Sequence, residues 1–320
     1  MIIKSVKSNE NERAFDVLAV GGVDVDLVMD VERIPAHGEK VMGKFVGRLP
    51  GGTVANFACA AAQLGLGVAS LSSVGADEAG KMLITDFERY GVATDFVLVR
   101  QGVETHFTVI LIEPSGERSI VVVPMFNETY DDDYLNQVIP QARAFYTMPN
   151  NADLFLRMAR IARANGVLVM IDVEATVGLD RRALETLLPW VDIASFNEAG
   201  LETIGGEQPT VEGARRLLAY GPDTVVVTLG RRGALAVSAT DVAEALGWEV
   251  AVRDTTGAGD TFNAAFLTAT LRNDPLKERL AFANAAAALA VTGLGPRGRL
   301  PTAAEVKAFM ASGAPDAWRG

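Results

Sequence analysis

The residues whose types and spacing best suit chemistry in this chain lie between Asp254 and Phe262. This segment reads Asp-Thr-Thr-Gly-Ala-Gly-Asp-Thr-Phe, and an apolar helical pattern follows it. The small residues Gly257, Ala258 and Gly259 let backbone N–H groups converge at the helix start, where the helix dipole also favours an anion. A carboxylate at Asp260 suits such a site if it accepts a proton from a hydroxyl while the N–H groups hold the transferred group. The alternative is a tight turn with Asp260 in an ordinary first helical turn.

A second group of polar residues suits a ligand with many hydroxyl groups. Gly51 and Gly52 precede an Ala-rich helical segment that contains Asn56. The two glycines let the backbone approach a ligand closely, and the Asn56 amide offers both a donor and an acceptor. Asp24 and Asp26 follow a predicted strand at a spacing of two, so they share one face if the strand continues. The alternatives are a helix cap at Asn56 and solvated loop carboxylates.

Two further segments follow predicted strands and suit a nucleotide. Asn197 and Glu198 could orient a hydrated Mg²⁺, which keeps several of its waters in proteins, and a helix N-cap at Asn197 is the alternative. The segment Thr228–Gly233 combines glycines with two arginines. It could hold nucleotide phosphate, and a hairpin turn with solvated arginines is the alternative.

Composition excludes several classes of function. The chain has 320 residues and a net charge of −11, without basic runs interleaved with aromatics, so we expect no nucleic-acid partner. One cysteine, Cys59, lies in an apolar helical stretch and reads as a buried small hydrophobe. The only histidines, His37 and His106, lack the spacing of a zinc site or a catalytic triad. No apolar leader or membrane span is expected, which makes a cytoplasmic protein the default.

The elements that position these residues alternate between strand and helix. Strand patterns occur at 15–22, 68–74, 166–171, 191–194, 224–228 and 234–237, and helical patterns at 56–64, 81–90, 152–165, 181–188 and 211–219. This alternation predicts an α/β fold with a mainly parallel sheet covered by helices on both faces. In such sheets the ligand lies at the carboxyl ends of the strands.

Two β-rich intervals do not follow the alternation. Residues 26–50 carry turn signals between short strand-like segments. Residues 95–123 include a hairpin pattern around the turn Pro114-Ser115-Gly116. We therefore expect these intervals to form a small β lid beside the main sheet.

Taken together, these residues resemble the ribokinase family of carbohydrate kinases, also called the PfkB family, from about Asp16 to Pro301. Two motifs carry the resemblance, one from Gly51 through Asn56 to Gly65 and one from Asp254 through Phe262, about 200 residues apart. The resemblance implies a single ribokinase-like kinase domain over residues 1–320. Its fold is expected to be a three-layer α/β/α sandwich with a mainly parallel central sheet and a small β-sheet lid formed by about 26–50 and 95–123.

The resemblance also implies an activity and its site. The activity is transfer of the ATP γ-phosphoryl group to a hydroxymethyl group of a small sugar or sugar-derived substrate, with Mg²⁺ and, in many members, K⁺. A homodimer through the β lid is expected as well. The implied residues are Asp260 as catalytic base with Gly257, Ala258 and Gly259 as anion hole; Asp24, Asp26, Gly51, Gly52 and Asn56 at the substrate; Asn197, Thr228, Gly230, Gly233 and Asn284 at the nucleotide; Asp254 and Thr256 at the monovalent cation; and Glu198 at Mg²⁺ through water.

The chain departs from the family pattern at two places. The Mg-associated motif is usually Asn-x-x-Glu, whereas Asn197 is followed here by Glu-Ala-Gly. Glu198 or Glu202 substitutes, or water and phosphate alone hold the metal. Thr53 stands where ribokinase-like members often have lysine.

The substrate stays open at this point. A ketohexose, a pentose, 2-keto-3-deoxygluconate and a nucleoside all belong to the class. Arg48 and Arg118 in the lid segments could pair with an anionic sugar, and solvated surface arginines are the alternative. A non-catalytic sugar or nucleotide sensor on the same fold is the competing function, and the altered Mg motif is its support.

Overall fold

The computed structural model describes residues 13–115, 117–124 and 128–313, and a nine-stranded sheet lies at its centre. The strands of this sheet are β1 (Phe15–Val20), β4 (Val68–Gly75), β5 (Val97–Arg100), β8 (Ala142–Thr147), β9 (Leu168–Val173), β10 (Ile193–Asn197), β11 (Thr224–Thr228), β12 (Gly233–Ser238) and β13 (Val242–Leu246). Their order is β13-β12-β11-β10-β9-β8-β1-β4-β5. At one edge β12 pairs antiparallel with both β11 and β13, and the other neighbours pair parallel, which confirms the predicted, mainly parallel sheet.

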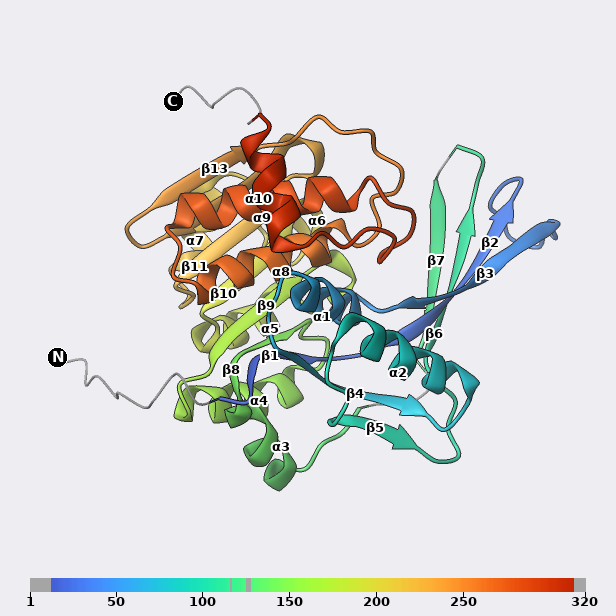
Figure 1. Ribbon diagram of the computed structural model, residues 1–320, viewed down its shortest axis with the longest axis horizontal. Helices are drawn as coiled ribbons and strands as arrows, with labels where there is room; N and C mark the ends of the chain where they lie inside the picture. Colours follow the sequence, from blue (N-terminus) through green and yellow to red (C-terminus); the bar gives the residue numbers. More distant parts are fainter. Residues whose placement is uncertain (1–12, 116, 125–127, 314–320) are drawn as a thin grey trace.

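Helices cover both faces of the sheet, as Figure 1 shows. One face packs against α1 (Thr53–Gln63), α2 (Glu78–Tyr90), α8 (Ala258–Leu271) and α9 (Leu276–Ala290), with α10 (Ala303–Ala311) outside α9. The other face packs against α3 (Asp132–Val138), α4 (Ala152–Ala164), α5 (Arg181–Leu187), α6 (Glu198–Thr203) and α7 (Val211–Leu218). Short 3₁₀ helices are η1 (Ile139–Gln141), η2 (Ala175–Val177), η3 (Leu188–Trp190) and η4 (Gly230–Arg232). The three-layer arrangement agrees with the expected fold.

The sequence of the strands explains why the core divides in two. Successive side chains of a strand point to opposite faces. In β1, Val17 and Ala19 enter the core on the α1 and α8 side, while Leu18 and Val20 enter the core on the α4 side. Cys59 is fully buried in the first of these cores, as its apolar neighbourhood predicts. None of the helices in the described ranges is long and apolar enough to cross a membrane.

A second sheet of four strands projects from one side of the molecule (Figure 1). It consists of β2 (Asp24–Val31), β3 (Gly43–Gly51), β6 (Phe107–Ile112) and β7 (Arg118–Val123), in the order β3-β2-β6-β7. Both predicted lid intervals contribute to it. The predicted lid interval 95–123 is too wide, because β5 pairs in parallel with β4 as the edge strand of the central sheet. Its short apolar pattern suits an edge strand of either sheet. Gly116 of the predicted turn lies outside the described residues.

Candidate active site

Asp260 lies in the first turn of α8, directly after the glycine-rich segment. Gly257 is the N-cap residue with φ 77°, a left-handed conformation that favours glycine. A Cβ at Gly257 would also lie 2.6 Å from the carbonyl oxygen of Pro296, so two constraints require glycine here. Asp260 is 7% exposed, and its Oδ2 accepts a hydrogen bond of 2.8 Å from Nδ2 of Asn56 in α1. The two motifs that stand far apart in the sequence therefore meet at this carboxylate.

The electrostatic surroundings of Asp260 favour a base with an elevated pKa. Burial raises the pKa of Asp260 well above its usual range, and the negative charges of Asp172 and Glu174 raise it further. The Asn56 hydrogen bond and the Arg297 guanidinium lower the same pKa. A carboxylate whose proton affinity is raised accepts a hydroxyl proton more readily than a solvated one, provided that it stays ionised at the working pH.

A pair of carboxylates lies at the start of β2, beside the end of β3. Asp24 and Asp26 point toward the same place, since a Cβ built on Gly51 would lie 2.6 Å from both Asp24 Oδ1 and Asp26 Oδ2. Thr108 donates to Asp24 Oδ2 across 3.1 Å, and Asp24 Oδ1 is buried without a hydrogen-bond partner among the described residues. Burial and the neighbouring Asp24 charge raise the pKa of Asp26 to about 7. This pair can accept hydrogen bonds from ligand hydroxyls.

Glycines allow close backbone packing next to the Asp24 and Asp26 carboxylates. Gly52 has φ 94°, and a Cβ there would lie 2.9 Å from the carbonyl oxygen of Gly22. The chain turns from β3 into α1 at this point, and α1 starts without a side-chain cap. Asn56 is therefore not the cap of its helix, and its amide is directed to Asp260 instead.

Arg297 is a central residue of the site that sequence reasoning missed. It lies in the loop after α9, and its side chain is 6% exposed. Its Nε donates to Asn56 Oδ1 across 3.0 Å and its Nη2 to the Gly51 carbonyl across 2.9 Å, while Nη1 pairs with Asp86 of α2. A single arginine in a polar loop gives no periodic or spacing signal, so only the fold reveals these contacts.

A cavity of about 320 Å³ lies at the N-terminus of α8. Ala258 and Gly259 line one end of it, so the cavity reaches the predicted anion hole. Four residues predicted at the nucleotide also line it: Thr228, Gly230, Gly233 and Asn284. Apolar walls that the sequence did not indicate come from Trp248, Val250, Val252, Phe262, Ala287 and Val291. The apolar lining and the glycine-rich N-terminus of α8 suit a partly apolar ring with phosphates directed to α8.

Asn197 and Glu198 do not line this cavity, although Asn197 lies beside Thr228 in the β10–β11 pairing. Asn197 is the N-cap of α6, and its Oδ1 accepts from the Gly200 N–H across 2.7 Å. Glu198 forms an ion pair with Arg232. Among the described residues no group of three or more His, Cys, Asp and Glu side chains could hold a metal ion. Mg²⁺ usually keeps several waters in proteins, so Asn197 and Glu198 remain the residues predicted to contact it through water.

The loop before α8 contains Asp254 and Thr256, the residues predicted at a monovalent cation. Asp254 Oδ1 accepts from the Thr256 N–H at 2.9 Å and from its hydroxyl at 2.7 Å, and Oδ2 accepts from the Gly295 N–H at 2.9 Å. Arg118 of the small sheet donates to the Thr256 hydroxyl and lies 3.7 Å from Asp254 Oδ1. The Arg118 guanidinium therefore lies beside the carboxylate that is predicted to bind the cation.

Comparisons with known proteins agree with this arrangement. The family model of the pfkB family carbohydrate kinases matches residues 14–303. The chain is 31% identical to a ribokinase of Haemophilus influenzae, over 91% of this chain and 97% of that protein. It is 28% identical to a ribokinase of Bacillus subtilis, over 92% of this chain and 99% of that protein. Among solved structures, Arabidopsis thaliana ribokinase complexed with ribose and ATP superposes with a TM-score of 0.82 at 28% identity, covering 93% of this chain and 99% of that one.

Proposed function

This chain belongs to the pfkB family of carbohydrate kinases and is an ATP-dependent carbohydrate kinase, and we propose that Asp260 is its catalytic base. Asp260 accepts the proton of a substrate hydroxymethyl group as the hydroxyl oxygen attacks the γ-phosphorus of ATP, and the bond from that phosphorus to the bridging oxygen breaks to release ADP. The N–H groups of residues 257–260 stabilise negative charge on the transferred group. Mg²⁺ carried by the ATP phosphates supplies charge neutralisation.

The position of Asp260 between two different sites carries this proposal. On one side lie the carboxylates of Asp24 and Asp26, which contact the position that a Gly51 side chain would take. On the other side lies the cavity lined by Ala258 and Gly259, which suits a nucleotide. A base at the junction of a hydroxyl-binding site and an anion site is what phosphoryl transfer to an alcohol requires.

We further propose that the substrate is a neutral sugar, with ribose as the first candidate. The substrate site presents the carboxyl groups of Asp24, Asp26 and Asp260, whose oxygens accept hydrogen bonds from sugar hydroxyls and whose ionised forms repel an anionic ligand. Arg297 is the cation whose charge all three experience. Its three guanidinium nitrogens are already engaged by Asn56, Gly51 and Asp86, so it offers no free fork to a phosphate or carboxylate. The ribose in the Arabidopsis complex supports the choice of a neutral pentose.

The lid arginines give no support to an anionic substrate. Arg48 is exposed on β3, and Arg118 contacts Thr256 and Asp254. A ribose-1-phosphate kinase of Halopiger xanaduensis is nevertheless 28% identical over 92% of this chain, so a phosphorylated pentose belongs in any substrate panel.

The test is ADP release with ATP and Mg²⁺ across neutral pentoses, ketohexoses, sugar acids, sugar phosphates and nucleosides, with product identification by mass spectrometry. We expect turnover on a neutral sugar, highest among the pentoses. Faster turnover on ribose 1-phosphate or a sugar acid would overturn the neutral-substrate proposal, and preference for a nucleoside would make the chain a nucleoside kinase. ATP and sugar binding without turnover of any compound would favour the sensor.

We also propose that the small sheet forms a homodimer interface. Its two edge strands expose apolar side chains that a single chain leaves in water: Phe45, Val46 and Leu49 on β3, and Ile120, Val121 and Val122 on β7. Several exposed apolar side chains on one sheet are typical of an interaction surface. Light scattering should give a dimer mass, and Val122→Lys should lower it to that of a monomer. A monomeric wild-type protein at micromolar concentration would contradict the proposal.

A further inference from the structure

The side chain of Arg297 connects three elements that converge on the active site. It reaches Asn56 in α1, the carbonyl of Gly51 at the end of β3, and the carboxylate of Asp86 in α2. The loop itself is held as well, because the Tyr90 hydroxyl donates to the Arg297 carbonyl across 3.1 Å. A charged side chain that is 6% exposed is costly to bury unless its donors are paired, and all three guanidinium nitrogens are paired here.

These contacts fix which way the Asn56 amide points. An asparagine side chain can present either its oxygen or its NH₂ group to a given neighbour. Arg297 Nε donates to Asn56 Oδ1, so the amide oxygen faces the guanidinium and Nδ2 faces Asp260 Oδ2 at 2.8 Å. The reversed amide would set its NH₂ group against the Arg297 donor and its oxygen against the Asp260 carboxylate. Both contacts of the reversed orientation are repulsive.

We propose that Arg297 is a positioning residue for phosphoryl transfer. Anchored by Asp86, it orients Asn56, and Asn56 in turn orients and ionises the catalytic carboxylate of Asp260. The same guanidinium also holds the Gly51 carbonyl at the end of β3. It therefore fixes the position of Gly51 relative to the Asp260 carboxylate. The inference rests on the proposed function, since it assigns Arg297 a role in the reaction attributed to Asp260.

The charge of Arg297 also opposes the groups that keep a proton on Asp260. Asp260 is buried in α8, and the carboxylates of Asp172 in β9 and Glu174 after it add negative charge. The charge of Asp260 in turn raises the pKa of the buried Tyr146 of β8. Against these stand the Asn56 hydrogen bond and the Arg297 cation, both of which lower the pKa of Asp260. Removing Arg297 therefore eliminates its own charge and also weakens the Asn56 hydrogen bond, the two contributions that lower the pKa of Asp260.

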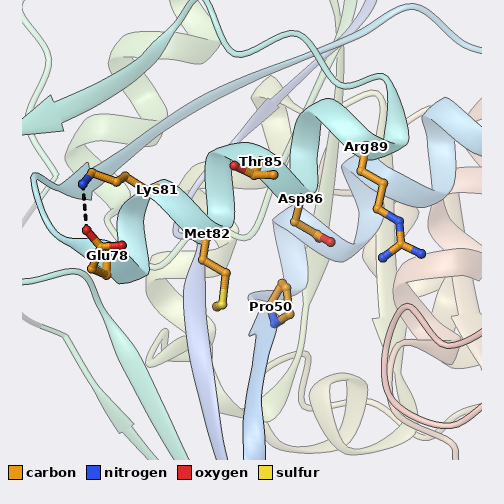
Figure 2. Close-up of a pocket in the computed structure, with 7 residues that line it drawn as sticks. All are labelled: Pro50, Glu78, Lys81, Met82, Thr85, Asp86 and Arg89. Carbon is orange, nitrogen blue, oxygen red and sulfur yellow. Dashed lines mark hydrogen bonds and ion pairs between the residues drawn. The ribbon is translucent and has the colours of Figure 1, made fainter.

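The anchor of Arg297 lies at the edge of a groove on the molecular surface. Figure 2 shows Asp86 between Met82 and Arg89 on the side of α2 that faces Pro50. The groove has a volume of about 510 Å³, while the Asp86 side chain itself is 12% exposed. Asp86 thus joins the exposed side of α2 to the buried guanidinium, and substitution there tests the anchor without entering the substrate site.

Three variants separate the roles of geometry and charge. Arg297→Gln removes the positive charge and the contacts with all three partners. Arg297→Lys keeps the charge but cannot contact all three partners at once. Arg299→Gln removes a charge from the exposed part of the same loop. Arg299 contacts Thr292 and none of the active-site residues above, so it is the matched control. Thermal unfolding is recorded first for every variant.

We expect Arg297→Gln to lower kcat about 10- to 100-fold, the effect of a misplaced reacting group, with the KM for ATP unchanged. The acid limb of its kcat/KM profile should move to higher pH, because Asp260 loses the groups that keep it ionised. Arg297→Lys should keep the acid limb of the wild-type protein but not its kcat. Arg299→Gln should match the wild-type protein in kcat and in the acid limb of the kcat/KM profile. NMR titration of ¹³C-aspartate protein, with the Asp260 signal assigned through Asp260→Asn, reads the same shift without turnover.

A folded Arg297→Gln protein with the wild-type pH profile and Asp260 titration would overturn the proposal. If Arg297→Gln fails to fold, Asp86→Asn gives the decision, with a smaller shift in the same direction expected and no shift contradicting it. An inactive wild-type protein would count against the proposed function alone, because the NMR titration still reports on Arg297.

Discussion

Nδ2 of Asn56 donates a 2.8 Å hydrogen bond to Oδ2 of Asp260, although the two residues lie 204 positions apart in the chain. Helices α1 and α8, which carry them, pack side by side on one face of the sheet. The contact joins a residue expected at the substrate to the expected base. Effects of substitutions at the two positions should therefore be non-additive, since each residue sets the state of the other.

Asp260→Asn should abolish most phosphoryl transfer without loss of the fold. The amide is nearly isosteric but accepts no proton, and general-base assistance contributes about 10²–10⁴-fold. Since burial raises the pKa of Asp260, its neutral replacement should leave the midpoint of thermal unfolding unchanged or higher. ADP release on the preferred sugar measures the first effect. Asp241→Asn, in an exposed turn, is the control. Near-normal turnover in Asp260→Asn would remove the base assignment.

Gly51→Ala should raise the KM for the sugar. Its Cβ would lie 2.6 Å from Asp24 Oδ1 and Asp26 Oδ2, so the carboxylates must move from their places. We expect the KM for the sugar to rise about tenfold or more, which corresponds to about 1.4 kcal/mol of lost binding free energy. The KM for ATP should change little. Gly22→Ala is the matched control, because no atom lies within 4 Å of its Cβ. Steady-state kinetics compare the two variants, and equal KM values would show that the Asp24 and Asp26 pair does not bind the sugar.

Sequence reasoning located this site where a local pattern marks it. Gly51, Gly52 and Asn56 form a glycine motif before a helix, and the spacing of Asp24 and Asp26 alone predicted a shared face. The structure adds that both carboxylates converge on Gly51. The glycine-rich segment before α8 was also predicted from the sequence, because its small residues let backbone N–H groups converge at a helix start.

Other parts of the molecule gave no usable signal. Arg297 acts through contacts with three elements that precede it by more than 200 residues. Asp172 lies inside an apolar strand, and only the fold brings its charge close enough to affect the pKa of Asp260. Strands β8 and β13 were not predicted, and β5 was assigned to the lid, since short apolar segments do not reveal which sheet they join. The Asn197–Glu198 pair had two interpretations, and the observed hydrogen bond is that of an N-cap.

Gly259→Ala should separate folding from catalysis. Gly259 is in the first turn of α8 with open space around its Cβ, and it lines the nucleotide cavity. Alanine should stabilise the helix by about 0.5–1 kcal/mol relative to glycine. The added methyl group reduces the space for phosphate, so the KM for ATP should rise and kcat should fall. Thermal unfolding and ATP titration measure the two effects, and unchanged ATP kinetics would place the phosphates elsewhere.

The stability of the protein should fall as the pH rises from about 4 to 7. Burial and the neighbouring Glu174 raise the pKa of Asp172 from 3.8 to about 7. Within that window the native state holds a proton that the unfolded state has released, so the free energy of unfolding decreases with increasing pH. Asp172→Asn, which keeps an acceptor for the Tyr146 hydroxyl, should flatten the profile. Urea unfolding at pH 5 and pH 7.5 tests this, with Asp241→Asn as control. Parallel profiles for Asp172→Asn and the wild-type protein would contradict it.

Arg118→Gln should increase the dependence of activity on K⁺. The Arg118 guanidinium of the small sheet lies 3.7 Å from Asp254 Oδ1 and contacts the Thr256 hydroxyl, where it supplies positive charge to the loop before α8. We therefore expect the wild-type rate to differ little between K⁺ and tetramethylammonium buffers. Without the guanidinium the Asp254 carboxylate is left to an external cation, so K⁺ should restore activity to the variant. Arg48→Gln, which removes the exposed arginine of β3, is the matched control. Strong K⁺ stimulation of equal size in all three proteins would show that Arg118 does not substitute for the ion.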